Sequence, residues 1–257
     1  GQADEGAAAA LLCRLEKGAS LSLTWKLTGG DREGTCVLAA YYELAEDARL
    51  HVSRLESGLT KTIIYDQRHS VLAARARADF YAAELGGEKI IIHSYGKLSG
   101  DASEMNERAI YAGRGRQHLD FFYHIDHVGK KTKAEIDLKG ALADESKKIF
   151  RGTLDFKRGC AGSVGDEGDF AIQLDPKTKN ISLPLLLCTE DDVQGNHASS
   201  AGQLDQNTIY FLMSRGFTLE EARRIVVEAL IRPIIDGMDE ALREEVLNAV
   251  RMKLDRE

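Results

Sequence analysis

The residues whose types and spacing best suit metal binding or other chemistry lie in one short segment, Asn196–Gly216, which reads NHASSAGQLDQNTIYFLMSRG. His197 is followed by five small residues, Ala198–Gly202, where another group can approach the backbone closely. A neutral imidazole at this place can ligate iron or zinc, or hydrogen-bond a partner. From the residues alone, a structural histidine satisfied by a local turn or helix start is the simpler interpretation.

A second histidine group, His124-Ile125-Asp126-His127, has the composition of a metal site. On a strand, however, His124 and Asp126 point to one face and His127 points to the other. The three side chains cannot chelate one ion without a bend in the strand. The sequence therefore predicts a structural role in a polar ladder or a turn.

The four cysteines, Cys13, Cys36, Cys160 and Cys188, have no CxxC spacing. A structural zinc site or a cluster held within one chain needs clustered ligands. We therefore expect four reduced thiols and a cytoplasmic protein.

Several kinds of chemistry have no motif in this chain. The sequence contains no GxxxxGK[ST] loop, no GxSxG elbow and no HExxH helix. A net charge of −7 argues against nucleic-acid binding, which favours a basic surface. No apolar run approaches the roughly 20 residues that a membrane span needs. We therefore expect neither a nucleic-acid partner nor a membrane association.

Period-two alternation of apolar and polar residues dominates residues 20–190. Phe121, Tyr123 and Ile125, for example, share one face of a predicted strand, and such a pattern indicates that this face is buried. Glycine-containing turns separate these short segments, without helices long enough for crossovers. The pattern predicts a mainly β protein and suits a parallel β-helix. A sandwich fits the periodicity almost equally well.

The segment from Ile181 to Cys188 is apolar on both faces. Ile181, Leu183 and Leu185 form one face, and Leu186 lies on the other. Pro184 has no N–H to donate to a ladder, so this strand should lie at a sheet edge or a bulge. An apolar outer face at an edge favours pairing with another chain. Burial under the C-terminal helices explains the pattern equally well.

Helical periodicity begins after Gly202. Gly216 is placed to end the first helix, and Thr218 with Glu221 forms a capping-box signature for the second. The second helix is expected to end near Arg232-Pro233. The predicted apolar side of this second helix comprises Ala222, Ile225, Val226 and Ala229. A third helix is expected from about Asp239, with an apolar side of Leu242, Val246, Leu247, Val250 and Leu254.

This organisation divides the chain into a β core, residues 1–202, and a C-terminal helical subdomain, residues 203–257. Three linked amphipathic helices can act as a cap or as a small docking domain.

Two segments carry a resemblance to a known family. DVQGNHASSAGQLDQNTIYFLMSRGFTLEEAR resembles the C-terminal signature of the SufB/SufD family of iron–sulfur cluster assembly proteins. The segment from His118 to Cys160 is similar to the family's central segment. The matching positions there are His118, His124, Asp126, His127, Lys139-Gly140, Ser146, Phe150 and Gly152.

The resemblance implies a right-handed parallel β-helix followed by C-terminal helices. It also implies a non-catalytic scaffold that works with an ABC-type, SufC-like ATPase and pairs with a sister SufB-like subunit or with a second copy of itself. In this family the helices dock on the ATPase, and the last strands pair the scaffolds where the cluster or sulfur passes. The candidate docking residues are Phe211, Arg215, Phe217, Glu221 and Ile225.

Within the family the chain resembles the SufD-like members, in a short form. These members carry the interface histidine at the position of His197, whereas SufB-like members have a glutamate after it, where this chain has Ala198. SufB-like members also have a reactive cysteine on an upstream strand, and Asp169–Leu174 contains none. His197 is the expected metal ligand, and Cys188 is kept as a second candidate for iron or sulfide without the family's reactive role.

We expect no stably bound cofactor and only a transient iron–sulfur cluster. Two alternatives remain at this point. One is a β-solenoid enzyme acting on a polysaccharide, and the other is a purely structural homodimer in which His197 is an interface hydrogen bonder.

Overall fold

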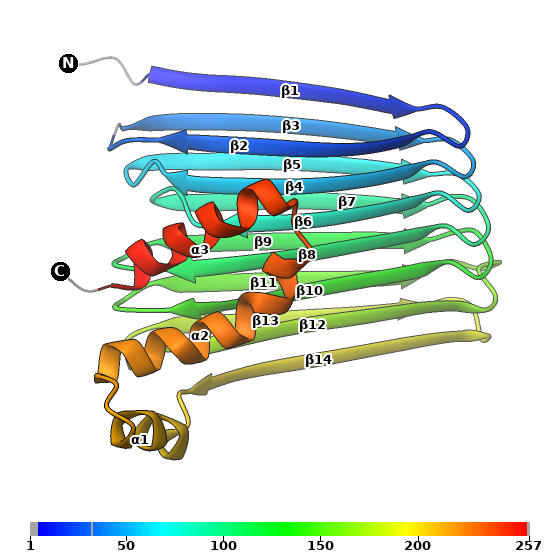
Figure 1. Ribbon diagram of the computed structural model, residues 1–257. Helices are drawn as coiled ribbons and strands as arrows, with labels where there is room; N and C mark the ends of the chain where they lie inside the picture. Colours follow the sequence, from blue (N-terminus) through cyan, green and yellow to red (C-terminus); the bar gives the residue numbers. More distant parts are fainter. Residues whose placement is uncertain (1–4, 32, 256–257) are drawn as a thin grey trace.

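A computed structural model describes residues 5–31 and 33–255, so the first four residues of the expected β core lie outside it. Strands alternate between two parallel seven-stranded sheets, so that each coil of the chain contributes one strand to each sheet (Figure 1). Sheet A consists of β1 (Glu5–Leu15), β3 (Gly34–Leu44), β5 (Thr62–Leu72), β7 (Lys89–Leu98), β9 (His118–His127), β11 (Lys147–Phe156) and β13 (Lys179–Cys188). Sheet B consists of β2 (Ser20–Gly29), β4 (Arg49–Gly58), β6 (Arg77–Glu84), β8 (Glu104–Gly113), β10 (Lys133–Leu142), β12 (Ser163–Gln173) and β14 (Val193–Gln203).

The predicted parallel β-helix is confirmed. Each strand pairs in parallel with the strand two places along the chain, so successive coils stack along one axis. A sandwich joined by hairpins would need antiparallel neighbours within each sheet, which this register excludes.

The alternation read from the sequence places the core between the two sheets. Phe121, Tyr123 and Ile125 point inward and are almost completely buried, and equivalent positions of the other coils join them in one apolar cluster. The inward rows also contain charged groups that the apolar pattern did not predict. Arg68 on β5 bonds Asp66 at 2.8 Å and Glu84 at 2.7 Å, and all three are buried.

Three helices follow the last strand: α1 (Gln206–Ser214), α2 (Leu219–Asp236) and α3 (Glu240–Leu254). Gly216 has a φ of 98°, and its N–H bonds the carbonyl of Met213 at 3.0 Å, as expected for a glycine that stops a helix. The capping box of Thr218 and Glu221 is present at the start of α2.

The predicted end of α2 is wrong, because the helix continues through Pro233 to Asp236. Pro233 is exposed, whereas Ile231 before it and Ile234 and Ile235 after it are buried against sheet B. These contacts hold the turn that contains the proline in the helix. The predicted inner face is also partly wrong. The buried residues are Ala222, Val227, Ile231, Ile234 and Ile235, whereas Ile225 and Val226 are half-buried and Ala229 is exposed.

Helices α2 and α3 lie across the outer face of sheet B (Figure 1). Val246 and Val250 of α3 pack in one cluster with Leu55, Ala83 and Ile110 of the sheet. No described helix is long and apolar enough to cross a membrane. The helices leave the outer face of sheet A uncovered, so the interpretation that β13 is buried beneath them is wrong.

Candidate functional site at the open end of the β-helix

β13 and β14 form the last coil and are the edge strands of their sheets. The edge position that Pro184 predicted is therefore confirmed. The outward row of β13 is apolar and exposed: Ile181 is 45%, Leu183 54%, Leu185 48% and Leu187 39% exposed. Because both strands end the described solenoid, their outer backbone edges have no described strand beside them. This end of the molecule combines unpaired strand edges with an apolar stripe.

His197 lies in the middle of β14, within a regular strand. This corrects the expectation of a turn or helix-start histidine, because the small residues Ala198–Gly202 continue the same strand. His197 is in register with Glu167 of β12, which is an inward-facing, buried position. In-register partners share a face, so the imidazole of His197 also points inward. It is exposed because no described coil covers it.

Cys188 is the last residue of β13 and is exposed. All four cysteines are free, and Cys188 is the exposed one among them. β14 begins at Val193, and His197 lies four residues further along it, roughly 13 Å at the rise of a strand. The structure thus places both candidates in the last coil but at different levels along the strands.

Glu167 is a site residue that the sequence did not single out. Its two carboxylate oxygens are buried and have no hydrogen-bond partner among the described residues. The carboxylate occupies the space left by Gly152 of β11, where an added Cβ would lie 2.0 Å from Oε1. Desolvation, with a smaller contribution from Asp169, raises the pKa of Glu167 to about 8. One row of the last coils therefore presents an imidazole and a buried carboxyl group side by side.

The alternation of β12 contained a signal for Glu167. Its position shares a face with the buried Ala171, so a charged residue is predicted to point into an apolar interior. Such an unpaired buried carboxyl group is costly unless a cation or donor satisfies it.

The group His124–His127 behaves largely as predicted. His124 and Asp126 face outward, with Nε2 3.0 Å from Oδ1, and His127 faces inward and stacks on Phe156 with ring centroids 4.3 Å apart. The neighbouring strand of sheet A, β11, adds Asp155, whose carboxylate lies close enough to His124 and Asp126 to share an ion. No local sequence pattern predicts this third group.

The outer cluster around His124 already has its own cation. The ammonium of Lys157 pairs with Asp155 and lies 3.2 Å from Asp126. The hydroxyl of Tyr95 also donates to Asp126. These contacts satisfy the carboxylates, which supports the structural role.

The expected docking residues divide into two groups. Phe211 and Phe217 are exposed, and the guanidinium of Arg215 lies over the Phe211 ring at 4.9 Å. Glu221 is engaged in the cap of α2, and Ile225 is half-buried. Other exposed apolar residues around α1 are Tyr210, Met213 and Leu219.

Comparisons with known proteins show similarity over most of this chain. Residues 1–230 match the family described as SUF system FeS cluster assembly, SufBD core domain. The iron–sulfur cluster assembly protein SufD of Bacillus subtilis (strain 168) is 26% identical over 204 residues, which are 79% of this chain and 46% of the relative.

Two further relatives are more distant. SufD of Escherichia coli (strain K12) is 20% identical over 210 residues, 80% of this chain and 50% of the relative. SufB of Bacillus subtilis (strain 168) is 21% identical over 189 residues, 73% of this chain and 40% of the relative. The chain spans about half the length of the curated relatives it matches. With a family match over most of its length and a parallel β-helix as its fold, this chain belongs to the SufBD core-domain family of the SUF iron–sulfur cluster assembly system.

Proposed function

We propose that this protein is a non-catalytic scaffold on which iron–sulfur clusters are assembled, coupled to an ABC-type ATPase. The observation that carries the proposal is the open end of the β-helix, where an exposed histidine lies on an edge strand whose outer side has no described strand beside it. A partner that pairs with β13 or β14 would enclose His197 between two subunits. A transient cluster would then be built at an interface that can open and close.

The pairing partner is a sister SufB-like subunit or a second copy of this chain. The exposed row of Leu183 and Leu185 supplies an apolar contact, and the edge backbone supplies a ladder of hydrogen-bonding groups. In either arrangement the partner brings its own ligands to His197. Iron and sulfide are the cargo of this site.

The chain's connectivity supports mechanical coupling. Only Leu204 and Asp205 separate β14 from α1, and Asp205 caps α1 by accepting from the N–H of Thr208 at 2.9 Å. An ATPase that binds the exposed Phe211 and Phe217 and moves on ATP binding would therefore pull directly on the strand that carries His197. The two helices packed on sheet B would stay in place.

The first experiment tests the partner. The chain is expected to co-purify with a SufC-like ATPase, and Phe211→Ser is expected to weaken this complex at least tenfold. A matched control is Met252→Ser, because Met252 is also exposed but lies at the far end of α3. A chain that never binds the ATPase, even in excess, contradicts the coupling.

The second experiment tests the histidine. His197→Ala should lower the cluster yield of anaerobic reconstitution while leaving the thermal unfolding midpoint unchanged, because the exposed imidazole makes few contacts. His118→Ala is the control, since His118 is exposed at the start of β9. An unchanged yield for His197→Ala rejects the ligand role. Sedimentation equilibrium of the chain alone and with a SufB-like subunit distinguishes the two pairing partners.

A further inference from the structure

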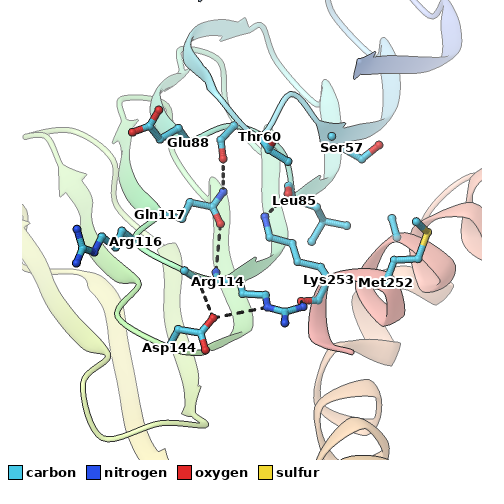
Figure 2. Close-up of a pocket in the computed structure, with 14 residues that line it drawn as sticks. Ser57, Thr60, Leu85, Glu88, Arg114, Arg116, Gln117, Asp144, Met252 and Lys253 are labelled. Atoms are coloured by element: carbon cyan, nitrogen blue, oxygen red, sulfur yellow. Dashed lines mark hydrogen bonds and ion pairs between the residues drawn. The ribbon is translucent and has the colours of Figure 1, made fainter. Parts of the chain in front are cut away.

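A cavity of about 640 Å³ lies along a narrow side of the solenoid, in coils that precede β13 and β14 (Figure 2). Four successive turns from sheet B to sheet A form one wall, and the last two turns of α3 form the other. We call this cavity the turn pocket. Its volume lies within the range of small-molecule sites.

The turn pocket has an apolar side and a fixed polar floor. Leu85 comes from a turn, and Ala249 and Met252 come from α3. Gln117 crosses the floor, and its amide donates to the carbonyls of Gly86 and Gly87 at 2.5 and 2.9 Å. Because these two bonds to the backbone fix the side chain of Gln117, this side of the cavity has a defined shape.

Lys253 brings a side-chain amino group to the turn pocket. Its ammonium donates to the carbonyl of Leu85, and no carboxylate pairs with it among the described residues (Figure 2). Burial lowers the pKa of Lys253 to about 7, and no neighbouring charge opposes this shift. Within the part of the chain that the structure describes, this partly buried ammonium has a carbonyl partner and lacks the counter-ion that such a group favours.

The other two cations that line the turn pocket, Arg114 and Arg116, have carboxylate partners. The guanidinium of Arg114 faces Asp144 at 3.6 Å and bonds the backbone carbonyl of Lys253 at 3.4 Å, which ties the end of α3 to the turn. Arg116 lies at the rim and pairs with Glu145 at 3.5 Å. Of the described cations that line the turn pocket, Lys253 is therefore the one without a carboxylate partner.

We propose that the turn pocket binds a small organic anion that carries one carboxylate on an apolar body, with Lys253 as the counter-ion. The ammonium of Lys253, which has no carboxylate partner in residues 5–31 and 33–255, matches one negative charge. The apolar body would lie against Leu85, Ala249 and Met252. The carboxylates of Asp144 and Glu88 also line the cavity, and they disfavour a doubly charged phosphate. This site is separate from the cluster-assembly function proposed above.

Calorimetric titration with octanoate tests the proposal on the full chain. Octanoate should bind one site per chain, and 1-octanol, octylammonium and phenyl phosphate should each bind at least tenfold more weakly. Lys253→Met keeps the apolar stem and removes the charge, so it should weaken octanoate binding at least tenfold. Ala249→Phe should abolish binding by filling the cavity. Lys130→Met is the control, because Lys130 is an exposed lysine in a different turn.

The proposal is overturned if octanoate does not bind, or if Lys253→Met binds it as tightly as the wild type. It is also overturned if octylammonium or phenyl phosphate binds more tightly than octanoate. A second experiment needs no variant: lysines of the wild-type protein are acetylated with an amine-reactive ester, and mass spectrometry measures the rate at each lysine. Octanoate should slow the acetylation of Lys253 at least tenfold and leave Lys130 unaffected, and equal slowing of both contradicts the proposed site.

Discussion

His127 gives a quantitative test of the structural role assigned to its motif. The imidazole is completely buried, its Nδ1 lies 2.7 Å from the hydroxyl of Thr132, and its Nε2 has no partner among the described residues. Desolvation lowers the pKa of His127 from 6.5 to about 4, against weaker opposing effects of Asp126 and Asp155. The folded protein therefore holds His127 neutral in a range where the unfolded chain takes up a proton.

The sign of the effect follows from this difference. Below pH 6.5 the unfolded state binds more protons than the folded state at His127, so acid favours unfolding. The contribution of neutral His127 to the free energy of unfolding is fully present above pH 6.5, the pKa in the unfolded state. It falls as the pH drops toward 4, the pKa in the folded state, and changes little further below that pH. A shift of this size corresponds to about 3 kcal/mol in all, of which about 2.5 kcal/mol is lost by pH 4.5.

The perturbation is His127→Gln, and the assay is urea unfolding at pH 7.0, 6.0, 5.0 and 4.5. The variant loses the ring contact with Phe156, so its stability at pH 7 should be lower. Its free energy of unfolding should nevertheless fall by about 2.5 kcal/mol less than that of the wild type between pH 7 and 4.5. His118→Gln, at an exposed position, should follow the wild type. Parallel curves for the wild type and His127→Gln would refute the reasoning.

Three further predictions concern the packing and the interface. Gly152→Ala should destabilise the protein by about 1–3 kcal/mol in urea unfolding, because the new Cβ would overlap the carboxylate of Glu167. Arg68→Met should cost about 3–5 kcal/mol in the same assay, since it removes the ion pair of the buried Glu84 and leaves the buried Asp66 with Arg54 alone. The double change Leu183→Lys and Leu185→Lys should convert any assembly through β13 into monomers in light scattering, with little loss of stability because both side chains are exposed.

Each of these predictions has a matched control. Gly202→Ala adds a Cβ into open space and should change the stability little, so equal costs at both glycines would contradict the packing argument. Arg75→Met removes exposed pairs with Glu46 and Asp47 and should cost much less than Arg68→Met, because solvent screens these charges. Leu12→Lys, at an exposed position on β1, should leave the assembly intact. Assembly that survives the β13 double change argues against pairing through that strand.

Much of the fold was predictable because the local pattern and the tertiary environment agree. The alternation of Phe121, Tyr123 and Ile125 marked the buried face of β9, and Pro184 marked an edge strand. Thr218 and Glu221 marked the start of α2. The end of α2 was not predictable in this way, because contacts of Ile234 and Ile235 with sheet B outweigh the local cost of Pro233.

The candidate site was only partly visible in the sequence. The family motif drew attention to His197, but nothing local showed whether the small residues after it form a turn or a strand. Pairing with β12 decides this, because its N–H and C=O groups provide a ladder for β14. The same pairing places His197 beside Glu167, a neighbour 30 residues away in the chain.

Periodicity and residues with restricted backbones predicted the inner and outer faces of the strands, the edge or bulge position of β13 and the change from strands to helices. The choice between a β-helix and a sandwich, which periodicity left open, and the groups that come into contact depend on the tertiary structure. Stacking of successive coils brings residues about 30 positions apart into contact, as for Glu167 and His197, and the packing of α3 on sheet B encloses the turn pocket around Lys253. Such contacts depend on the length of each coil and on the path of the helices, which no local pattern encodes.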